Sequence, residues 1–260
     1  MQKITVITSR ENPAVKHYIR LRDRKKTRYD ENLFVAEGLR IVRDALQYSF
    51  LVQQIFLTEP AFEKYAGMLE AESGQLFRIP EALGREMSDT EHTQGVFAVC
   101  RMPEQNLKLS PEGRYLVLCQ VQDPGNMGMI LRTCDALGTD AVLMTQCCDL
   151  YSPKVIRATM GSVFRVPVLR TDTPEELLTL LSQQKICSYA SVPAASAVPL
   201  TECRFGHGCA VWIGNEGNGL PETVIHACQK AVTIPMKGGA ESFNAAMAAG
   251  ILTWEMMKSD

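Results

Sequence analysis

Three short stretches in the second half of the chain combine glycine, amide and charged residues in a way that suits ligand binding. The stretch VWIGNEGNGL (211–220) breaks an apolar run into a loop with three glycines around a single carboxylate, that of Glu216. Glycines let a backbone approach a ligand closely, but a negative charge at the centre disfavours a polyphosphate. The loop therefore predicts a site for another kind of ligand, although a plain turn before the helix that Pro221 begins explains some of the same residues.

A second stretch, QDPGNMGMILR (122–132), leads from an apolar run into a predicted helix. Asn126 is expected to cap that helix, and Gly128 lies one helical turn before Arg132 on the same face. The missing side chain at Gly128 leaves room beside the arginine for a bound group. A capped helix with a surface arginine is the simpler alternative.

A third stretch, IPMKGGAESFNAAMAAG (234–250), follows the last apolar run. Pro235 ends or borders a strand, and either Ser242 or Asn244 is expected to open a helix whose alanines allow very close packing. A tight contact between helices explains these small residues as well as a ligand does. All three stretches follow predicted strands, and ligands of open parallel sheets bind beyond the carboxyl ends of the strands.

The elements that must position these stretches read as alternating strands and helices. Strands are predicted at 115–121, 140–145, 163–169, 186–192, 208–214 and 231–236. Helices are predicted at 126–138, 152–161 with Ser152 as its cap, 173–184 with Thr173 as its cap, 220–229, and from about Ser242. Strands that are apolar on both faces, with helices between them, are typical of a parallel α/β sheet.

The first hundred residues predict a smaller α/β domain. A helix is expected from Pro13 and another at 39–47, with strands at 33–38, 53–58 and 95–100. The polar, proline-bearing residues 104–114 are interpreted as a linker. The predicted domains are therefore 1–103 and 115–260.

The first helix is the most charged stretch of the protein. Between Lys16 and Arg28 seven residues are basic, against the single acid Asp23. A solvated helix face explains this pattern, and so does a surface that follows the phosphates of a nucleic acid, where each cation neutralises one backbone charge. The candidate RNA contacts on this helix are Lys16, Arg20, Arg24, Lys25, Lys26 and Arg28.

Composition limits the classes of protein to which the chain can belong. With 260 residues, 46% of them hydrophobic, it suits one large or two modest globular domains, and its net charge of -2 confines any nucleic-acid binding to a local patch. The N-terminus lacks a secretory signal and no apolar run approaches a membrane span, so a cytoplasmic protein with reduced cysteines is expected. Cys203, His207 and Cys209 lack an evident fourth ligand, so no metal is expected.

The three stretches together resemble the ordered motifs of the SpoU/TrmH family of RNA ribose 2′-O-methyltransferases, within the SPOUT superfamily. The motifs NMGMILR, IGNEGNGL and IPMKGGAESFNAAMAAG occur in this order, and the resemblance covers residues 115–258. The N-terminal hundred residues resemble the small substrate-binding domain, similar to a ribosomal RNA-binding protein, that often precedes it. Phe243 stands where the family commonly has leucine, an apolar change that should keep the pocket.

The resemblance implies a fold and a chemistry that the residue patterns alone do not give. It implies a parallel sheet with a C-terminal trefoil knot, which is otherwise nearly absent from proteins. It also implies S-adenosylmethionine as methyl donor, held in the knot by Gly214, Asn215, Gly219, Ile234, Met236 and Phe243. The implied catalytic residues are Asn126, Arg132, Glu216, Ser242 and Asn244. No metal is needed, and a homodimer through the knotted domain is implied.

Several alternatives remain open on the sequence. Glu216 either contacts the donor or holds a backbone or arginine partner. Ribosomal RNA is favoured over transfer RNA as substrate, because the leading domain resembles those of ribosomal enzymes. An RNA-binding module without catalysis is disfavoured, since all five catalytic positions match. A Rossmann dehydrogenase is disfavoured too, because no G-x-G-x-x-G follows the first strand of either domain.

Overall fold

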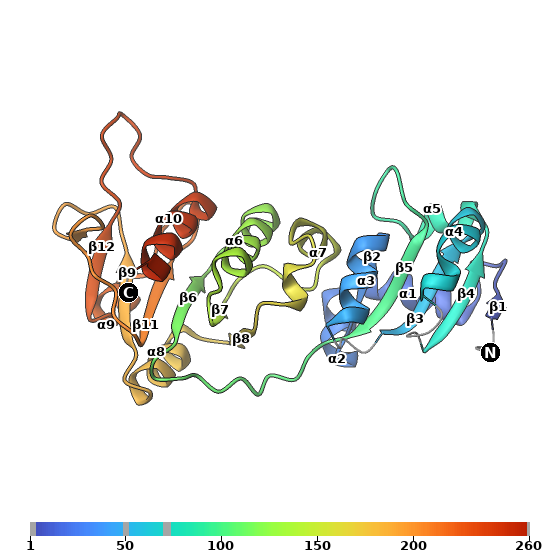
Figure 1. The fold of residues 1–260 in the computed structure, drawn as a ribbon, viewed down its shortest axis with the longest axis horizontal. Coiled ribbons are helices and arrows are strands. Elements are labelled where there is room, and N and C mark those ends of the chain that lie inside the picture. The colour runs from blue at the N-terminus through green and yellow to red at the C-terminus, as the bar shows by residue number, and fades with distance from the viewer. Residues whose placement is uncertain (1–3, 49–51, 70–73, 259–260) are drawn as a thin grey trace. The chain divides into compact units, whose positions relative to one another are not determined.

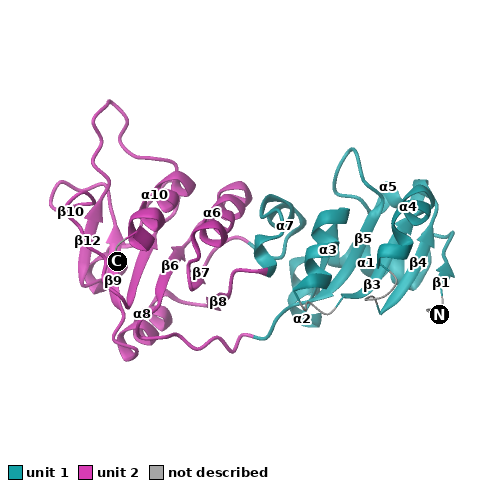
Figure 2. Cartoon of the chain, viewed as in Figure 1, with its two compact units in different colours: residues 1–104, 149–164 teal, residues 105–148, 165–260 magenta. Residues whose placement is uncertain are grey.

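The computed structural model describes residues 4–48, 52–69 and 74–258, which divide into two compact units (Figure 2). Unit 1 comprises residues 1–104 and 149–164, and unit 2 comprises residues 105–148 and 165–260. The segment 149–164 packs with the N-terminal unit although it lies inside the range 115–260 that the sequence analysis gave to the second domain. The predicted domain limits themselves stay a prediction.

Unit 1 is built on a five-stranded mixed sheet. Its strands lie in the order β1 (Ile4–Val6), β4 (Gln75–Ile79), β3 (Val52–Thr58), β5 (Val96–Arg101) and β2 (Leu33–Glu37). The first three strands are parallel, and β5 runs antiparallel to both β3 and β2. The helices are α1 (Pro13–Asp23), α2 (Lys25–Glu31), α3 (Leu39–Gln47), α4 (Glu59–Leu69), α5 (Glu81–Met87) and α7 (Pro153–Ala158) (Figure 1). The small α/β domain expected from the sequence is therefore confirmed as a fold class.

An aromatic cluster forms much of the core of unit 1. The ring of Tyr18 on α1 meets the rings of Phe56 and Phe97 edge to face, with centroids 5.8 Å apart in both pairs. All three side chains are fully or almost fully buried. Edge-to-face pairs at this separation add to the gain from burying apolar area, so the apolar face of α1 is fixed against the sheet and its charged face is left to solvent.

The basic stretch forms two helices rather than the single one that its charge pattern indicated. Asn12 caps α1 through a bond from the Ala14 N–H, and the chain breaks at Arg24, which is extended with φ -121° and ψ 109°. The guanidinium of Arg28 on α2 donates back to the carbonyls of Leu21 and Arg22 at the end of α1. These bonds satisfy carbonyls that a helix end leaves without partners.

Arg28 is buried, and this contradicts its assignment as a surface contact to RNA phosphate. Only 4% of the residue is exposed, and its guanidinium forms an ion pair with Asp149. The hydroxyl of Tyr29 donates to the second oxygen of the same carboxylate, at 2.8 Å. A buried arginine needs a paired carboxylate because the isolated charge is costly to desolvate, so Arg28 holds the 149–164 segment in unit 1.

Unit 2 is built on a seven-stranded sheet whose pairs are all parallel, which confirms the predicted parallel α/β sheet, although β10 was not among the six predicted strands. Its strands lie in the order β10 (Val198–Pro199), β12 (Lys230–Thr233), β9 (Cys187–Ser191), β11 (Cys209–Ile213), β6 (Arg114–Cys119), β7 (Ala141–Thr145) and β8 (Val168–Thr171). Every residue of the adjacent strands β11, β6 and β7 is buried, which explains why these strands read as continuous apolar runs.

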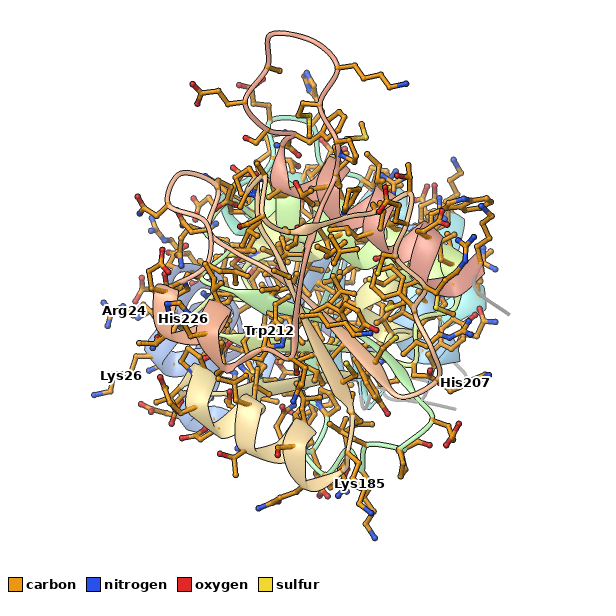
Figure 3. The ribbon with its side chains drawn as sticks, turned by 90° about the vertical axis from the view of Figure 1, so that its left-hand side faces the viewer. Arg24, Lys26, Lys185, His207, Trp212 and His226 are labelled. Carbon is orange, nitrogen blue, oxygen red and sulfur yellow. The ribbon has the colours of Figure 1, made fainter. Side chains whose placement is uncertain are left out.

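Four helices cover the sheet of unit 2. Helices α8 (Pro174–Gln183) and α9 (Glu222–Ala227) pack on the face that carries Val117, Leu143 and Trp212. Helix α10 (Ala245–Lys258) packs against α6 (Pro124–Leu137) and on strands β6 and β11. Figure 3 shows Trp212 inside the ribbon, with α8 and α10 on opposite sides of the strands.

Several predicted element boundaries are wrong in instructive ways. The strand expected at 163–169 begins only at Val168, because residues 162–164 form a 3₁₀ turn and Pro167 has no N–H to give to a ladder. The last helix begins at Ala245, because the side chain of Asn244 accepts the N–H groups of Ala246 and Met247. The caps at Ser152 and Thr173 are confirmed. In the part of the chain that the structure describes, no helix has the length and apolar character to cross a membrane.

We predict that Asp149→Asn destabilises unit 1 by about 3 kcal/mol, because it leaves the buried guanidinium of Arg28 without its counter-charge. Hydrogen exchange of the unit 1 core measures the loss. The control is Lys26→Gln, which changes an exposed cation on the same helix and should shift stability by less than about 0.5 kcal/mol. Equal protection in the two variants would contradict the structural role of the pair.

Candidate ligand site at the carboxyl edge of the second sheet

A cavity of about 540 Å³ lies in unit 2, where loops that follow three neighbouring strands meet. The lining includes residues 191–194 at the end of β9, residues 213–220 at the end of β11, and residues 233, 234 and 236 at the end of β12. The rest of the lining comes from Glu222 and Ile225 on α9, from residues 241–243, and from Ala245 and Ala248 at the start of α10. The cavity is within the range of roughly 300–1,000 Å³ that holds small ligands and cofactors, and it occupies the edge where parallel sheets bind them.

The glycine loop after β11 is closed on itself by backbone bonds. The N–H of Asn215 donates to the carbonyl of Gly219 at 2.9 Å, and the reverse bond measures 3.0 Å. A Cβ atom at Gly214 would lie 2.2 Å from the carbonyl carbon of Gly219, and Gly219 itself has a φ of +69°. Both positions therefore require glycine, one for space and the other for backbone conformation.

Asn215 stabilises the same loop with its side chain. Its carboxamide oxygen accepts the N–H groups of Gly217 and Asn218, both at 3.0 Å. Its amide nitrogen donates to the carbonyl of Gln120, at 2.9 Å, just beyond the end of β6. The loop that carries the predicted second motif is thus fastened to the strand end that carries the first.

The carboxylate of Glu216 accepts hydrogen bonds from backbone N–H groups and does not pair with a cation of the described chain. Its carboxylate accepts the N–H groups of Gln122 and Asp123, at 3.1 and 3.0 Å, and the side-chain amide of Asn126, at 3.0 Å. Burial alone raises the pKa of Glu216, but the bonds from Asn126, Asp123 and Gln122 outweigh it and lower the pKa below its usual value. The structure thus gives Glu216 backbone and amide partners and, among the described residues, no arginine partner, while contact with the donor stays a prediction.

Asn126 does not cap helix α6, which corrects the sequence prediction. Asp123 is the cap, since its carboxylate accepts the Asn126 N–H at 2.8 Å, and Pro124 then begins the helix. The Asn126 side chain, almost fully buried, is therefore free to join a second partner. Its carboxamide oxygen accepts the side-chain amide of Asn244, at 3.0 Å.

A single chain of hydrogen bonds thus runs from Glu216 through Asn126 to Asn244. The carboxamide oxygen of Asn244 is occupied by the N–H groups of Ala246 and Met247, so its nitrogen must point towards Asn126. The carboxylate fixes the orientation of Asn126 in the same way. A carboxamide nitrogen has two N–H groups, and each asparagine uses one of them within the chain. One N–H of each asparagine is thus left over, and neither residue is among those that line the cavity, which the hydrogen-bond chain reaches through Glu216.

The other predicted donor-binding residues line the cavity. Its lining includes all six predicted donor-binding residues, which are Gly214, Asn215, Gly219, Ile234, Met236 and Phe243. It also includes Glu216 and Ser242 from the predicted catalytic set. Phe243 is 42% exposed, which leaves its ring accessible to a ligand. The lining combines bare backbone with apolar side chains, a composition suited to a flat heterocycle such as a nucleoside.

Arg132 is placed apart from this group. It lies on the exposed side of α6, does not line the cavity, and makes no hydrogen bond or ion pair with the described residues. The structure therefore brings together Asn126, Glu216 and Asn244, with Ser242 in the adjoining lining, but leaves Arg132 outside.

The predicted RNA contacts in unit 1 divide into exposed and engaged side chains. Arg20, Arg24, Lys25 and Lys26 are exposed, and Figure 3 shows Arg24 and Lys26 pointing away from the ribbon. The Lys16 ammonium pairs with Glu11, whereas Arg28 is buried. The ammonium of Lys25 lies 5.7 Å from the ring centroid of Tyr29, so this helix offers an aromatic face beside its cations.

The cysteine and histidine pattern near residue 205 does not form a metal site within the described parts of the chain. Cys203 and Cys209 are buried, whereas His207 is exposed and lies at the edge of the ribbon in Figure 3. Among the residues placed in the structure, no three His, Cys, Asp or Glu side chains gather closely enough to hold an ion. All nine cysteines are free thiols.

Several residues of the site escaped the sequence analysis. One is Asp123, because the sequence prediction gives the cap of α6 to Asn126, although an aspartate directly before Pro124 is a recognised start of a helix. Residues 191–194 after β9, together with Glu222 and Glu241, also line the cavity. Only the order of the strands brings β9 beside β11, and local sequence carries no signal for that order.

Comparisons with known proteins identify the family of the chain. Residues 113–254 match the model of the SpoU rRNA Methylase family, and residues 12–98 match the MRM3-like substrate binding domain. The chain is 32% identical over 251 residues to the 23S rRNA (guanosine(2553)-2'-O)-methyltransferase RlmP of Bacillus subtilis, covering 96% of this chain and 98% of that protein. It is 28% identical to the 23S rRNA (uridine(2479)-2'-O)-methyltransferase of Streptomyces viridochromogenes, covering 90% of this chain and 85% of that one.

Solved structures give the same result. The AdoMet-bound rRNA methyltransferase from Sinorhizobium meliloti superposes with a TM-score of 0.88 at 30% identity, covering 97% of both chains. The fold class expected from the sequence is thereby confirmed as that of SPOUT-type methyltransferases with an N-terminal substrate-binding domain.

We predict that Gly214→Ala opens the loop after β11, because the new methyl group would overlap the backbone of Gly219 and Leu220. The expected loss of stability is about 2 kcal/mol, measured by thermal unfolding together with hydrogen exchange of the loop. Gly217→Ala is the matched control, since its Cβ would meet only the Asn215 side chain, at 3.7 Å. Equal protection of the loop in both variants would show that the close approach at Gly214 is not needed.

Proposed function

Because the chain belongs to the SpoU rRNA Methylase family, we propose that it transfers a methyl group from S-adenosylmethionine to a ribose 2′-hydroxyl of RNA. The observation that carries this proposal is the chain of hydrogen bonds from Glu216 to Asn244, which joins three separate segments beside one cavity. Ribosomal RNA is the proposed substrate, in line with relatives named as 23S rRNA 2'-O-methyltransferases.

The cavity suits the methyl donor in size and in lining. The backbone of Gly214, Asn215 and Gly219, with the side chains of Ile234, Met236 and Phe243, would hold its adenosine and its tail. When bound, S-adenosylmethionine supplies a methyl group on a positively charged sulfur, so that a C–O bond forms as the C–S bond breaks, the sulfur leaves as a neutral thioether, and the proton of the 2′-hydroxyl is released to water. The absence of a side chain at Gly214 allows the loop backbone to close tightly beside such a ligand.

The residues of the hydrogen-bond chain act on the ribose. Asn126 and Asn244 present N–H donors in fixed orientations, which would position the ribose oxygens and stabilise negative charge as it develops on the 2′-oxygen. Ser242 would orient the ribose or the donor tail. Glu216 acts as a positioning residue, since its own oxygens are bound by N–H groups.

Arg132 would clamp an RNA phosphate and support the developing alkoxide. A literal role as base is disfavoured, because the guanidinium pKa lies far above neutrality. Its bidentate fork suits a phosphate, and its position on the exposed side of α6 leaves it free to meet RNA.

We also propose a homodimer, in which Arg132 of one subunit works beside the cavity of its partner. This would account for an arginine that does not line the cavity of its own chain. Met129 on α6 and Met247 and Trp254 on α10 are each more than half exposed, at 53%, 52% and 59%. Met247 and Trp254 lie seven residues apart and share one helix face, which suits an apolar interface.

The C-terminal trefoil knot and the cytoplasmic location stay predictions. The knot is supported by the order of the strands, because the chain passes from β12 at one side of β9 back to α10, which packs on β6 and β11.

Mapping 2′-O-methylated nucleotides in total RNA, with and without the gene, tests the activity. One ribosomal position should lose its methyl group in the deletion strain and regain it when the gene is restored. Full restoration by an Asn126→Ala variant would show that the hydrogen-bond chain does not serve the reaction.

We predict that Arg132→Lys lowers kcat on ribosomal RNA by about a hundredfold, because a lysine keeps the charge but loses the planar fork. Binding of S-adenosylmethionine should not change, since Arg132 does not line the cavity. Methyl transfer and donor binding are measured separately. Near-normal methylation would dismiss the bidentate clamp.

We predict that the exposed cations of α1 and α2 contribute to RNA affinity through phosphate neutralisation. Replacing Arg20, Arg24, Lys25 and Lys26 by glutamine should reduce the slope of log Kd against log salt by roughly 0.7 for each lost contact to single-stranded RNA. A control with the same loss of charge carries Lys64→Gln, Arg85→Gln, Lys108→Gln and Lys185→Gln, all at exposed positions elsewhere. Identical slopes for the two variants would remove the proposal of a specific surface.

We predict that Trp254→Lys converts the dimer to a monomer in sedimentation velocity, because it places a charge in the apolar interface. Met68→Lys, at a position 54% exposed in unit 1, serves as the control and should leave the dimer intact. A wild-type protein that sediments as a monomer would refute the dimer outright.

A further inference from the structure

The lining of the cavity carries negative charge and no cation. Three carboxylates contribute to it, those of Glu216, Glu222 and Glu241, and no lysine or arginine is found among its described residues. The nearest cation along the chain, Lys237, lies in the loop between two lining segments but does not line the cavity itself. The lining therefore favours a ligand that carries positive charge.

Two of the three carboxylates remain without a strong partner. The oxygens of Glu216 are bound by backbone and Asn126 N–H groups, as described above. Glu222 lies 3.6 Å from His226 in a pair that is about 80% exposed on both sides, and such pairs contribute little. Glu241 makes no ion pair with any residue that the structure describes. Glu222 and Glu241 are thus available to act on the charge of a ligand.

The proposed donor and its by-product differ mainly in charge. S-adenosylmethionine carries a sulfonium, an ammonium and a carboxylate, a net charge of about +1, whereas the demethylated S-adenosylhomocysteine has a neutral sulfur and a net charge of about zero at pH 7. Their adenine, ribose and amino-acid tail are the same. Backbone groups and apolar side chains such as Ile234 and Phe243 make the same contacts with both.

We propose that Glu222 and Glu241 select the methyl donor over its by-product by charge, an inference that rests on the function proposed above. A carboxylate near the cavity attracts the cationic donor and has no net attraction for the neutral by-product. The effect is electrostatic, so it weakens as salt is added. By this means the by-product leaves more readily after each transfer, and product inhibition is reduced.

Isothermal titration of the full-length protein with each ligand tests this proposal without any RNA. The variants are Glu222→Gln, Glu241→Gln and the double variant, each of which removes charge and keeps shape. The double variant should bind S-adenosylmethionine about fivefold to tenfold more weakly at low salt, and S-adenosylhomocysteine within about twofold of the wild type. The difference should shrink as salt approaches 0.5 M or so.

Glu112→Gln is the matched control, because this exposed carboxylate precedes β6 and so lies at the opposite, amino edge of the sheet. It should leave both affinities unchanged. Equal weakening of the two ligands in the double variant, or no weakening of either, would overturn the charge selection while leaving the methyltransferase proposal intact. A wild-type protein that binds neither ligand would overturn both.

Discussion

The site depends on the hydrogen bonds that the Glu216 carboxylate accepts at the start of helix α6. Three N–H groups, from Gln122, Asp123 and Asn126, converge on one charged group near a helix N-terminus, where a negative charge is favoured. The cost of partly burying the carboxylate would otherwise raise its pKa, and these donors more than offset it. The Glu216 carboxylate therefore has a structural role, because its hydrogen bonds fix the position of the first turn of α6 relative to the glycine loop after β11.

The orientation of both asparagines follows from that one charge. Asn126 must direct its nitrogen to the carboxylate, which leaves its oxygen for Asn244, and the cap of α10 fixes Asn244 from the other end. The register of the sheet makes these meetings possible, since β11 pairs with β6 residue for residue up to Ile213 and Leu118. The loop after Ile213 therefore lies next to the loop after β6, although about ninety residues separate them along the chain.

Local patterns predicted much of the fold because their causes are local. Ser152 and Thr173 bond to N–H groups three residues away, so the sequence contains both partners of each cap. The same reasoning failed at Asn126, where two candidate caps compete and the true partner of the asparagine is Glu216. The order of the strands, and with it the contribution of residues 191–194 to the cavity, depends on long-range pairing that no local pattern records.

The role of a charged residue is difficult to predict from the sequence, because a basic side chain can either be buried in an ion pair or remain exposed to bind RNA. In the basic stretch, Arg28 is buried against Asp149, whereas Lys25 and Lys26, three and two residues earlier, remain in solvent. The number of cations in the sequence cannot distinguish a buried arginine from an exposed lysine. The difference depends on the Asp149 carboxylate, more than a hundred residues away, whose attraction offsets the desolvation cost of burying Arg28. A buried arginine is fixed by its partner and is lost to RNA, so only the cations left outside can follow a phosphate backbone.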